Sequence, residues 1–219
     1  MCFSAQASFT ASAVLAGITL LNLRTINNKQ LLPLAFVPAF FAIQQFSEGV
    51  LWLTAAQHFQ PAWLANLAQN SYLFFAFVFW PLWIPFCLAI LEKVVWRKIA
   101  ILLLQAGGVL FSLYMIKVGL EETVHVSMYQ HSLQYVVYNV PSMIEIYAAI
   151  TLLPCYFSSL KSMWIFGVLA TVSFFLSLYF YEQTFTSVWC FFSAVISISL
   201  YKVLRDNTHP AAAQPQEKY

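Results

Sequence analysis

Charged residues are what this sequence most clearly lacks. Only 8% of its 219 residues are charged, whereas 61% are hydrophobic. A water-soluble domain needs a larger share of charged surface than this. The composition therefore excludes an ordinary soluble domain and predicts an integral membrane protein.

Sequence motifs of known chemistry are missing as well. The chain has no glycine-rich phosphate-binding loop, no HExxH or CxxC motif, no internal repeat and no basic patch suited to nucleic acid. Its first residues, MCFSAQASF, also lack the positive charge with which a secretory signal peptide begins. We therefore expect no nucleic-acid partner, and we expect the first apolar segment to be an uncleaved membrane anchor.

Long apolar runs are present instead. Crossing a hydrocarbon layer of about 30 Å takes roughly 20 helical residues, because every backbone amide must find its partner within the segment. The runs predict an all-α integral membrane protein, a seven-transmembrane-helix bundle with helices at residues 8–23, 32–56, 64–90, 99–118, 136–157, 163–181 and 186–203. This bundle is expected to occupy residues 1–204. Residues 205–219, rich in Pro and Ala, are expected to form a disordered cytoplasmic tail.

Basic residues are distributed unevenly around these segments. With seven spans, one side of the membrane carries all but one of them: Arg24, Lys29, Lys93, Arg97, Lys98, Lys161, Lys202, Arg205 and Lys218. Because positive residues favour the cytoplasmic side, we predict that the N-terminus lies outside and the C-terminus lies in the cytoplasm. Glu92 and Arg97 are then expected to form an ordinary surface charge pair in a cytoplasmic turn.

Two acidic residues fall inside predicted membrane helices. Glu48 lies in the stretch QQFSEGVLWL of the second helix, and Glu145 lies in MIEIYAAI of the fifth. The two helices run in opposite directions, so we expect both carboxyls about 10 Å below the outer ends of their helices, at about 1.5 Å per residue. An ionised carboxylate in a membrane helix costs roughly 2.5–3.5 kcal/mol. The pair is therefore expected to hold a proton, a metal or another cation.

Other polar residues recur at helical spacing near the same level. The second helix carries Gln44, Gln45, Glu48 and Trp52 on one face, and the fifth is preceded and begun by His131, Tyr135, Tyr138, Ser142 and Glu145. The seventh helix carries a stripe of small and polar residues, Ser187, Cys190, Ala194 and Ser197. We therefore expect a polar cavity that opens to the outside and is closed toward the cytoplasm.

Structural interpretations compete with this one. A protonated Glu48 can lock helix packing next to the small Gly49. Glu145 can instead cap backbone groups freed by Pro141, four residues before it. Loop histidines such as His131 are often solvated.

The four cysteines separate by their expected depth. Cys2 and Cys190 lie toward the outer face, and a disulfide between them is open in an oxidising compartment. A packed, apolar role is equally open for Cys190. Cys87 and Cys155 lie in the inner halves of their helices and are expected to be small apolar fillers.

Four stretches carry a resemblance to a known family. MCFSAQAS, EGVLWL, FWPLWIPFCLAILE and SVWCFF extend from Cys2 to about Ser193. They resemble a family of small, uncharacterised bacterial multi-span proteins that begin MCFSA and carry a domain-of-unknown-function label. The resemblance implies an integral membrane protein, with a bacterial inner membrane as its expected location, and it implies no activity.

Two classes of function fit these residues, and the pattern favours the first. In the first, the protein is a metal-dependent membrane enzyme of the hydrolase type, with Glu48 and Glu145 as catalytic carboxyls. A divalent metal such as zinc is then held by Glu48, His131, Glu145, Cys190 and Cys2, and its bound water attacks a lipid or another amphipathic substrate. In the second, it is a non-catalytic binding, transport or sensor protein in which Glu48 and Glu145 form a proton or cation site. The expected partners are membrane lipids and a lipid or small-molecule ligand from the outer side.

Overall fold

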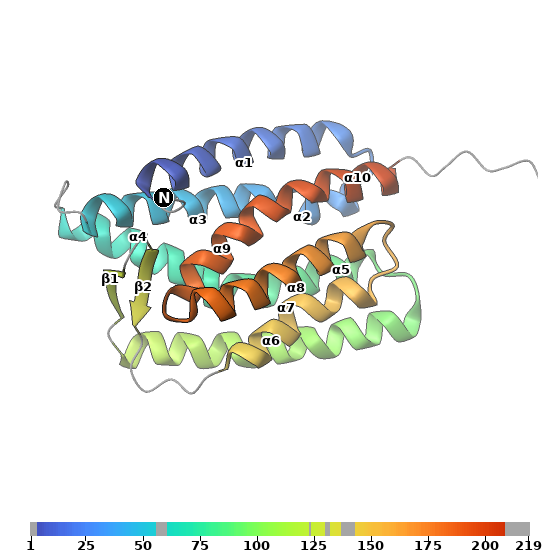
Figure 1. Ribbon diagram of the computed structural model, residues 1–219. Coiled ribbons are helices and arrows are strands. Elements are labelled where there is room, and N and C mark those ends of the chain that lie inside the picture. The colour runs from blue at the N-terminus through green and yellow to red at the C-terminus, as the bar shows by residue number, and fades with distance from the viewer. Residues whose placement is uncertain (1–3, 56–60, 123, 130–131, 137–142, 209–219) are drawn as a thin grey trace, which may run out of the picture.

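The chain folds into helices that run back and forth along one long axis, with a two-stranded hairpin at one end (Figure 1). The computed structural model describes residues 4–55, 61–122, 124–129, 132–136 and 143–208. Helix α1 begins at the end of the bundle that holds the hairpin, and α10 finishes at the opposite end. We call these the hairpin end and the basic end, the second because most of the described basic residues lie there.

The elements follow one another as α1 (Ala5–Thr25), η1 (Lys29–Leu31), α2 (Leu32–Ala35), α3 (Val37–Ala55), α4 (Ala62–Phe74), η2 (Phe75–Phe79), α5 (Trp80–Leu91), α6 (Val95–Glu121), β1 (His125–Tyr129), β2 (Ser132–Val136), α7 (Ile144–Phe157), α8 (Met163–Phe180), η3 (Glu182–Thr184), α9 (Phe185–Ile196), η4 (Ser197–Ser199) and α10 (Leu200–Thr208).

Six stretches of the described chain are long and apolar enough to cross a membrane: Ala5–Thr25, Lys29–Ala55, Ala62–Leu91, Val95–Glu121, Met163–Phe180 and Glu182–Thr208. Helix α7 is also apolar but has only 14 residues. The surface of the bundle is apolar too, since α6 exposes Leu103, Leu110 and Leu120 by 69%, 70% and 84%. These features indicate a membrane-embedded protein, as the sequence predicts. The predicted seventh span stays a prediction.

The fifth predicted helix, residues 136–157, is wrong at its start. Val136 ends strand β2, and α7 begins only at Ile144. The strands pair antiparallel, with His125 opposite Val136 and Tyr129 opposite Ser132. The sequences HVSMY and SLQYV alternate between polar and apolar residues, which is the period of a strand and not of a helix.

Helix α3 belongs to the most buried of the six long apolar stretches. Buried residues make up 72% of the most apolar window of Lys29–Ala55, compared with 22% for Ala5–Thr25 and for Val95–Glu121. Helix α1 packs along α3 so closely that a Cβ atom at Gly49 would lie 2.7 Å from the ring of Phe9. The close approach that the sequence suggested at Gly49 is therefore present. A polar residue in the middle of α3 is screened from lipid by neighbouring helices.

A π-helical turn, η2, joins α4 to α5. The N–H of Trp80 donates to the carbonyl oxygen of Phe75, five residues before it. Pro81 follows and has no N–H to continue the regular pattern. Ser112 of α6 donates to the carbonyl oxygen of Val78 at 3.0 Å and so satisfies a backbone group of this turn. Such turns within helices often occur at functional sites.

The loops and helix ends that carry most of the described basic residues lie together at the basic end (Figure 1). Glu92 is 3% exposed there. It accepts hydrogen bonds from the N–H of Val94 at 2.8 Å and from the N–H and hydroxyl of Ser159 at 2.6 and 2.9 Å. Burial raises the pKa of the Glu92 carboxyl, but these hydrogen bonds outweigh burial and hold the pKa below its ordinary value. Glu92 therefore ties the α5–α6 loop to the α7–α8 loop, and the expected surface pair with Arg97 is wrong.

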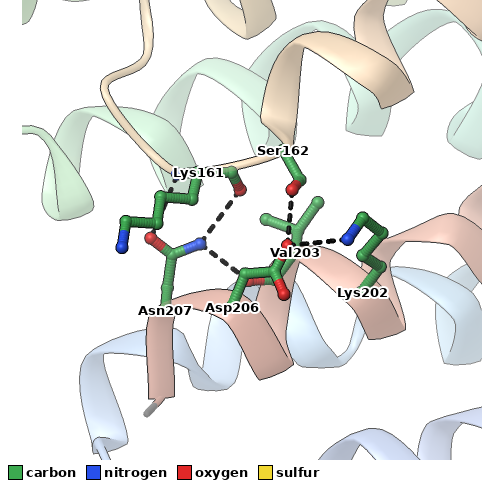
Figure 2. Close-up of polar contacts among 6 residues, drawn as sticks. All are labelled: Lys161, Ser162, Lys202, Val203, Asp206 and Asn207. Carbon is green, nitrogen blue, oxygen red and sulfur yellow. Dashed lines mark hydrogen bonds and ion pairs between the residues drawn. The ribbon is translucent and has the colours of Figure 1, made fainter. Parts of the chain in front are cut away.

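A second polar cluster fixes α10 at the basic end (Figure 2). Ser162 donates its hydroxyl hydrogen to Oδ2 of Asp206 at 2.5 Å, and Lys202 Nζ lies 3.1 Å from the same oxygen. The Asn207 side chain bonds both the N–H and the carbonyl oxygen of Lys161, each at 3.1 Å. Helix α10 thus continues past the predicted domain boundary at residue 204. Residues 209–219 of the predicted tail lie outside the described residues.

Candidate functional site

One face of α3 holds the polar residues that the sequence singled out. Gln44 and Gln45 are fully buried, and Glu48 and Trp52 are only 2% and 9% exposed. Their three- and four-residue spacing places them on one side of the helix. Glu48 lies about 10 Å from the end of α3 at Ala55, given a rise of about 1.5 Å per residue.

The stripe of small and polar residues on α9 and η4 meets this face of α3. Its four members are all buried: Ser187, Cys190, Ala194 and Ser197. Ser187 donates a hydrogen bond from its hydroxyl to Oε1 of Glu48. The second and seventh predicted helices therefore come together at Glu48.

Gln44 connects the site to α5. The indole Nε1 of Trp80 donates to Oε1 of Gln44 at 2.8 Å, and both side chains are buried. The Trp80 ring stacks on Phe41 with a centroid distance of 3.9 Å. This bond fixes which way the Gln44 amide points. The Cys190 thiol lies within reach of Gln44 from the α9 side.

Two tyrosines cover the site from the hairpin end. Tyr72 of α4 and Tyr135 of β2 stack in parallel, with ring centroids 4.7 Å apart and an angle of 1° between the rings. The Tyr72 hydroxyl donates to the carbonyl oxygen of Thr186 at 3.2 Å. Both phenols lie near Glu48 and Cys190. The hairpin therefore contributes a side chain to a site that otherwise belongs to helices.

Several polar atoms of the site are buried and have no hydrogen-bond partner among the described residues. They are Nε2 of Gln44, Nε2 and Oε1 of Gln45, Oε2 of Glu48, Nε1 of Trp52 and the hydroxyl of Tyr135. Buried polar groups are nearly always paired in native proteins. In this structure such atoms are concentrated on the Glu48 face of α3 and on Tyr135, which covers it.

An apolar cavity adjoins these groups. Its volume is about 170 Å³, and it lies between η2, α6, α7 and α9. Its wall includes Phe77, Phe111, Tyr147, Trp189 and Cys190. A smaller cavity of about 40 Å³ follows on the other side of Tyr147 and Trp189 and also reaches Cys190. Cys190 is therefore the residue at which the polar cluster and the apolar space meet.

Tyr72 was missed by the sequence interpretation, although a signal for it existed. It directly follows Gln69, Asn70 and Ser71, a polar run near the start of the third predicted helix. Ser71 contacts α3 through Ser47, with 3.2 Å between the hydroxyl oxygens. Tyr72, one residue further along, is fully buried in this polar stretch of helix and is therefore a candidate site residue.

The structure places the other predicted site residues in different surroundings or does not describe them. Glu145 is exposed in the first turn of α7. The expectation that it lies well below the outer end of its helix is wrong, because α7 begins at Ile144 and not near residue 136. No interaction between described residues joins Glu145 to Glu48. Cys190 is a buried free thiol. Cys2 and His131 lie outside the described residues.

The predicted metal site is incomplete in the part of the chain that the structure describes. No group of three or more His, Cys, Asp or Glu residues there is placed to hold a metal ion. Glu48 and Cys190 do lie in one cluster. The set of five predicted ligands therefore stays a prediction.

Comparisons with known proteins identify a family without an assigned activity. Neither the curated proteins nor the solved structures contain a match to the chain. A family model described as "Family of unknown function (DUF6629)" matches residues 1–215. This match covers nearly the whole chain and agrees with the resemblance seen in the sequence motifs. The chain belongs to this family of unknown function, DUF6629.

Proposed function

We propose that this protein is a membrane binding or transport protein in which Glu48 holds a proton or a small cation. The observation that carries the proposal is the surroundings of the Glu48 carboxyl. It is 2% exposed, and its Oε2 forms no hydrogen bond of normal length with the described residues, although the Gln45 side chain lies close to the carboxyl. The ion pairs between described residues, Lys117–Glu121 and Lys202–Asp206, both lie elsewhere. A carboxylate in such a place needs a positive charge or a proton.

The neighbours of Glu48 suit this role. The Ser187 hydroxyl occupies Oε1, which leaves Oε2 for the bound proton or cation. The unpaired carboxamide oxygen of Gln45 and the hydroxyl of Tyr135 are further oxygens that a cation can use. Oxygen atoms of carboxylate, amide and hydroxyl groups are the usual ligands of hard cations.

Access from the hairpin end follows from the distribution of charge. Most basic residues lie at the basic end, which we assign to the cytoplasm, so that the N-terminus lies outside. A bacterial plasma membrane fits this assignment. Glu145, exposed next to cavity residues Met143 and Ile144, is then on the outer side, where its charge attracts cations toward the entrance.

The test is the thermal stability of purified protein in a series of alkali-metal and ammonium chlorides at constant ionic strength. A cation that binds only the folded state stabilises it, by about 2.7 kcal/mol at 100 times its dissociation constant. We expect a cation- or pH-dependent rise in melting temperature for the wild type. Glu48→Gln is expected to abolish this rise, and Glu145→Gln to keep at least about half of it, since screening weakens exposed charges. An unchanged response in Glu48→Gln contradicts the proposal.

A metal-dependent membrane hydrolase acting on a lipid or another amphipathic substrate is the second candidate. It is favoured by one observation, the presence of Glu48 and Cys190 in the same cluster. A carboxylate and a thiolate suit zinc. The test is metal content after gentle purification. About one zinc per chain in the wild type, lost in both Glu48→Gln and Cys190→Ala and retained in Glu92→Gln, would favour this candidate over the first.

A further inference from the structure

The aromatic-walled cavity beside the Glu48 cluster is assigned no occupant by the proposal above. Its volume is about 170 Å³. An apolar cavity of about 150 Å³ is large enough to take up benzene. The space therefore fits one aromatic ring or a short aliphatic chain, and it is too small for a whole lipid.

The rings around this cavity are held in fixed positions by one another. Tyr147 meets Trp189 edge to face, with centroids 5.4 Å apart and an angle of 78°. Phe111 also packs against Tyr147, with ring centroids 5.6 Å apart. Phe185 stacks on Trp189 at 5.4 Å. A rigid aromatic wall of this kind favours a flat apolar body and also attracts a nearby organic cation.

One turn of α9 connects the cavity to the polar cluster. Thr186 and Cys190 line the cavity. Ser187, between them in sequence, bonds Glu48. The Cys190 thiol also lies near Glu48 and Tyr72. The cavity therefore reaches the polar cluster at Cys190, and Glu48 is the acidic residue of that cluster.

The acidic side chain of Glu48 determines which polar group a molecule bound in the cavity can carry. Glu48 is acidic, and none of the described residues that line the cavity is charged. The unpaired oxygens of Glu48 and Gln45 accept hydrogen bonds, as an ammonium group requires. An anionic group would instead face a carboxyl group without a basic side chain to balance it.

From this geometry we propose that the site binds a small organic amine, with its ammonium group at Glu48 and its aromatic or short aliphatic body in the cavity of Phe111, Tyr147 and Trp189. This inference rests on the proposed function and names its ligand class. It also gives the unpaired groups around Glu48 and the aromatic cavity a single common occupant.

The test uses benzylamine as the probe and benzyl alcohol as its neutral counterpart of nearly the same shape. Binding is measured by calorimetry on protein in lipid nanodiscs, with empty nanodiscs subtracted. We expect the wild type to bind benzylamine about tenfold or more tightly than benzyl alcohol, the usual scale of a hydrogen bond to a charged group. Glu48→Gln is expected to remove this preference, and Glu121→Gln, at an exposed carboxyl in the last turn of α6, to leave it within about threefold of wild type.

Two cavity-filling variants test the position of the apolar body. Ala76→Leu and Ile144→Phe add volume at residues that line the cavity. We expect each variant that keeps a wild-type melting temperature to weaken both probes. Equal affinity of the wild type for the two probes, or a preference for benzylamine that survives in Glu48→Gln, would overturn the inference.

The same samples separate this inference from the proposed function. A wild type that responds to inorganic cations through Glu48, but binds benzylamine no better than benzyl alcohol, overturns the inference and leaves the proposed function intact. A wild type whose stability is indifferent to cations and pH, and equal to that of Glu48→Gln under all conditions, removes both.

Discussion

Replacing Gly108 by alanine is expected to lower the stability of the bundle by roughly 3 kcal/mol, the upper end of the usual range for overpacking. Gly108 lies where α6 crosses the start of α5. A Cβ atom added there would lie 2.2 Å from the carbonyl oxygen of Pro81 and 3.1 Å from its carbonyl carbon. These are backbone atoms, so no side-chain rotation can relieve the clash. For a chain of this size the loss corresponds to roughly 6–12 °C in melting temperature.

The adjacent glycine supplies the matched control. A Cβ atom at Gly107 would meet only the side chain of Ile150, at 3.8 Å, which is an ordinary contact. Alanine is better than glycine in a helix by about 0.8–1.0 kcal/mol. Gly107→Ala is therefore expected to be neutral or slightly stabilising. Equal losses in the two variants, measured by thermal unfolding in detergent, would contradict the packing of α6 on α5 described above.

Replacing Glu48 by methionine together with Ser187 by alanine is expected to leave stability within about 1 kcal/mol of wild type or to raise it. Both partners of a buried polar contact are removed, and methionine fills a similar volume. Exchanging a complete buried polar pair for apolar groups is often neutral or stabilising. The response of stability to cations and pH is expected to disappear in this variant. Stability that is unchanged or raised, together with a lost response to cations and pH, would show that Glu48 serves binding and does not stabilise the fold.

Gln44→Met is the control for this prediction, because Gln44 lies on the same face of α3 and is equally buried. Its removal leaves the indole Nε1 of Trp80 buried without its acceptor. We expect a loss of about 1–3 kcal/mol, the usual cost of an unpaired buried donor. Thermal unfolding of the two variants measures the loss of stability in each. A loss above about 3 kcal/mol in the Glu48–Ser187 double variant would instead make Glu48 a lock for helix packing.

Helical periodicity was enough to predict the part of the candidate site that α3 and α9 form. The three- and four-residue spacing on α3 and α9 pointed to Glu48, Ser187 and Cys190, and the structure brings these residues together. The prediction worked because both segments are regular helices near Glu48. In such segments the side on which a residue lies follows from its position alone.

The hairpin end could not be predicted in the same way. Treating residues 136–143 as helix placed Glu145 well below a helix end, whereas α7 begins at Ile144. Alternating residues in SLQYV carry the signal for a strand, but five residues are too few to outweigh the apolar run that follows. The stacking of Tyr135 on Tyr72 joins strand β2 to α4, which are distant in sequence. Spacing along one segment carries no information about such a contact.

The account depends most directly on the Glu48 carboxyl binding a proton or cation inside the bundle. Infrared difference spectroscopy of the protein in lipid nanodiscs, recorded between acidic and alkaline pH and with and without added cation, measures this directly. The account predicts a carbonyl band from a protonated carboxyl group that changes with pH or cation, is absent in Glu48→Gln and persists in Glu145→Gln. A band that persists in Glu48→Gln, or a wild type without any such change, would contradict it.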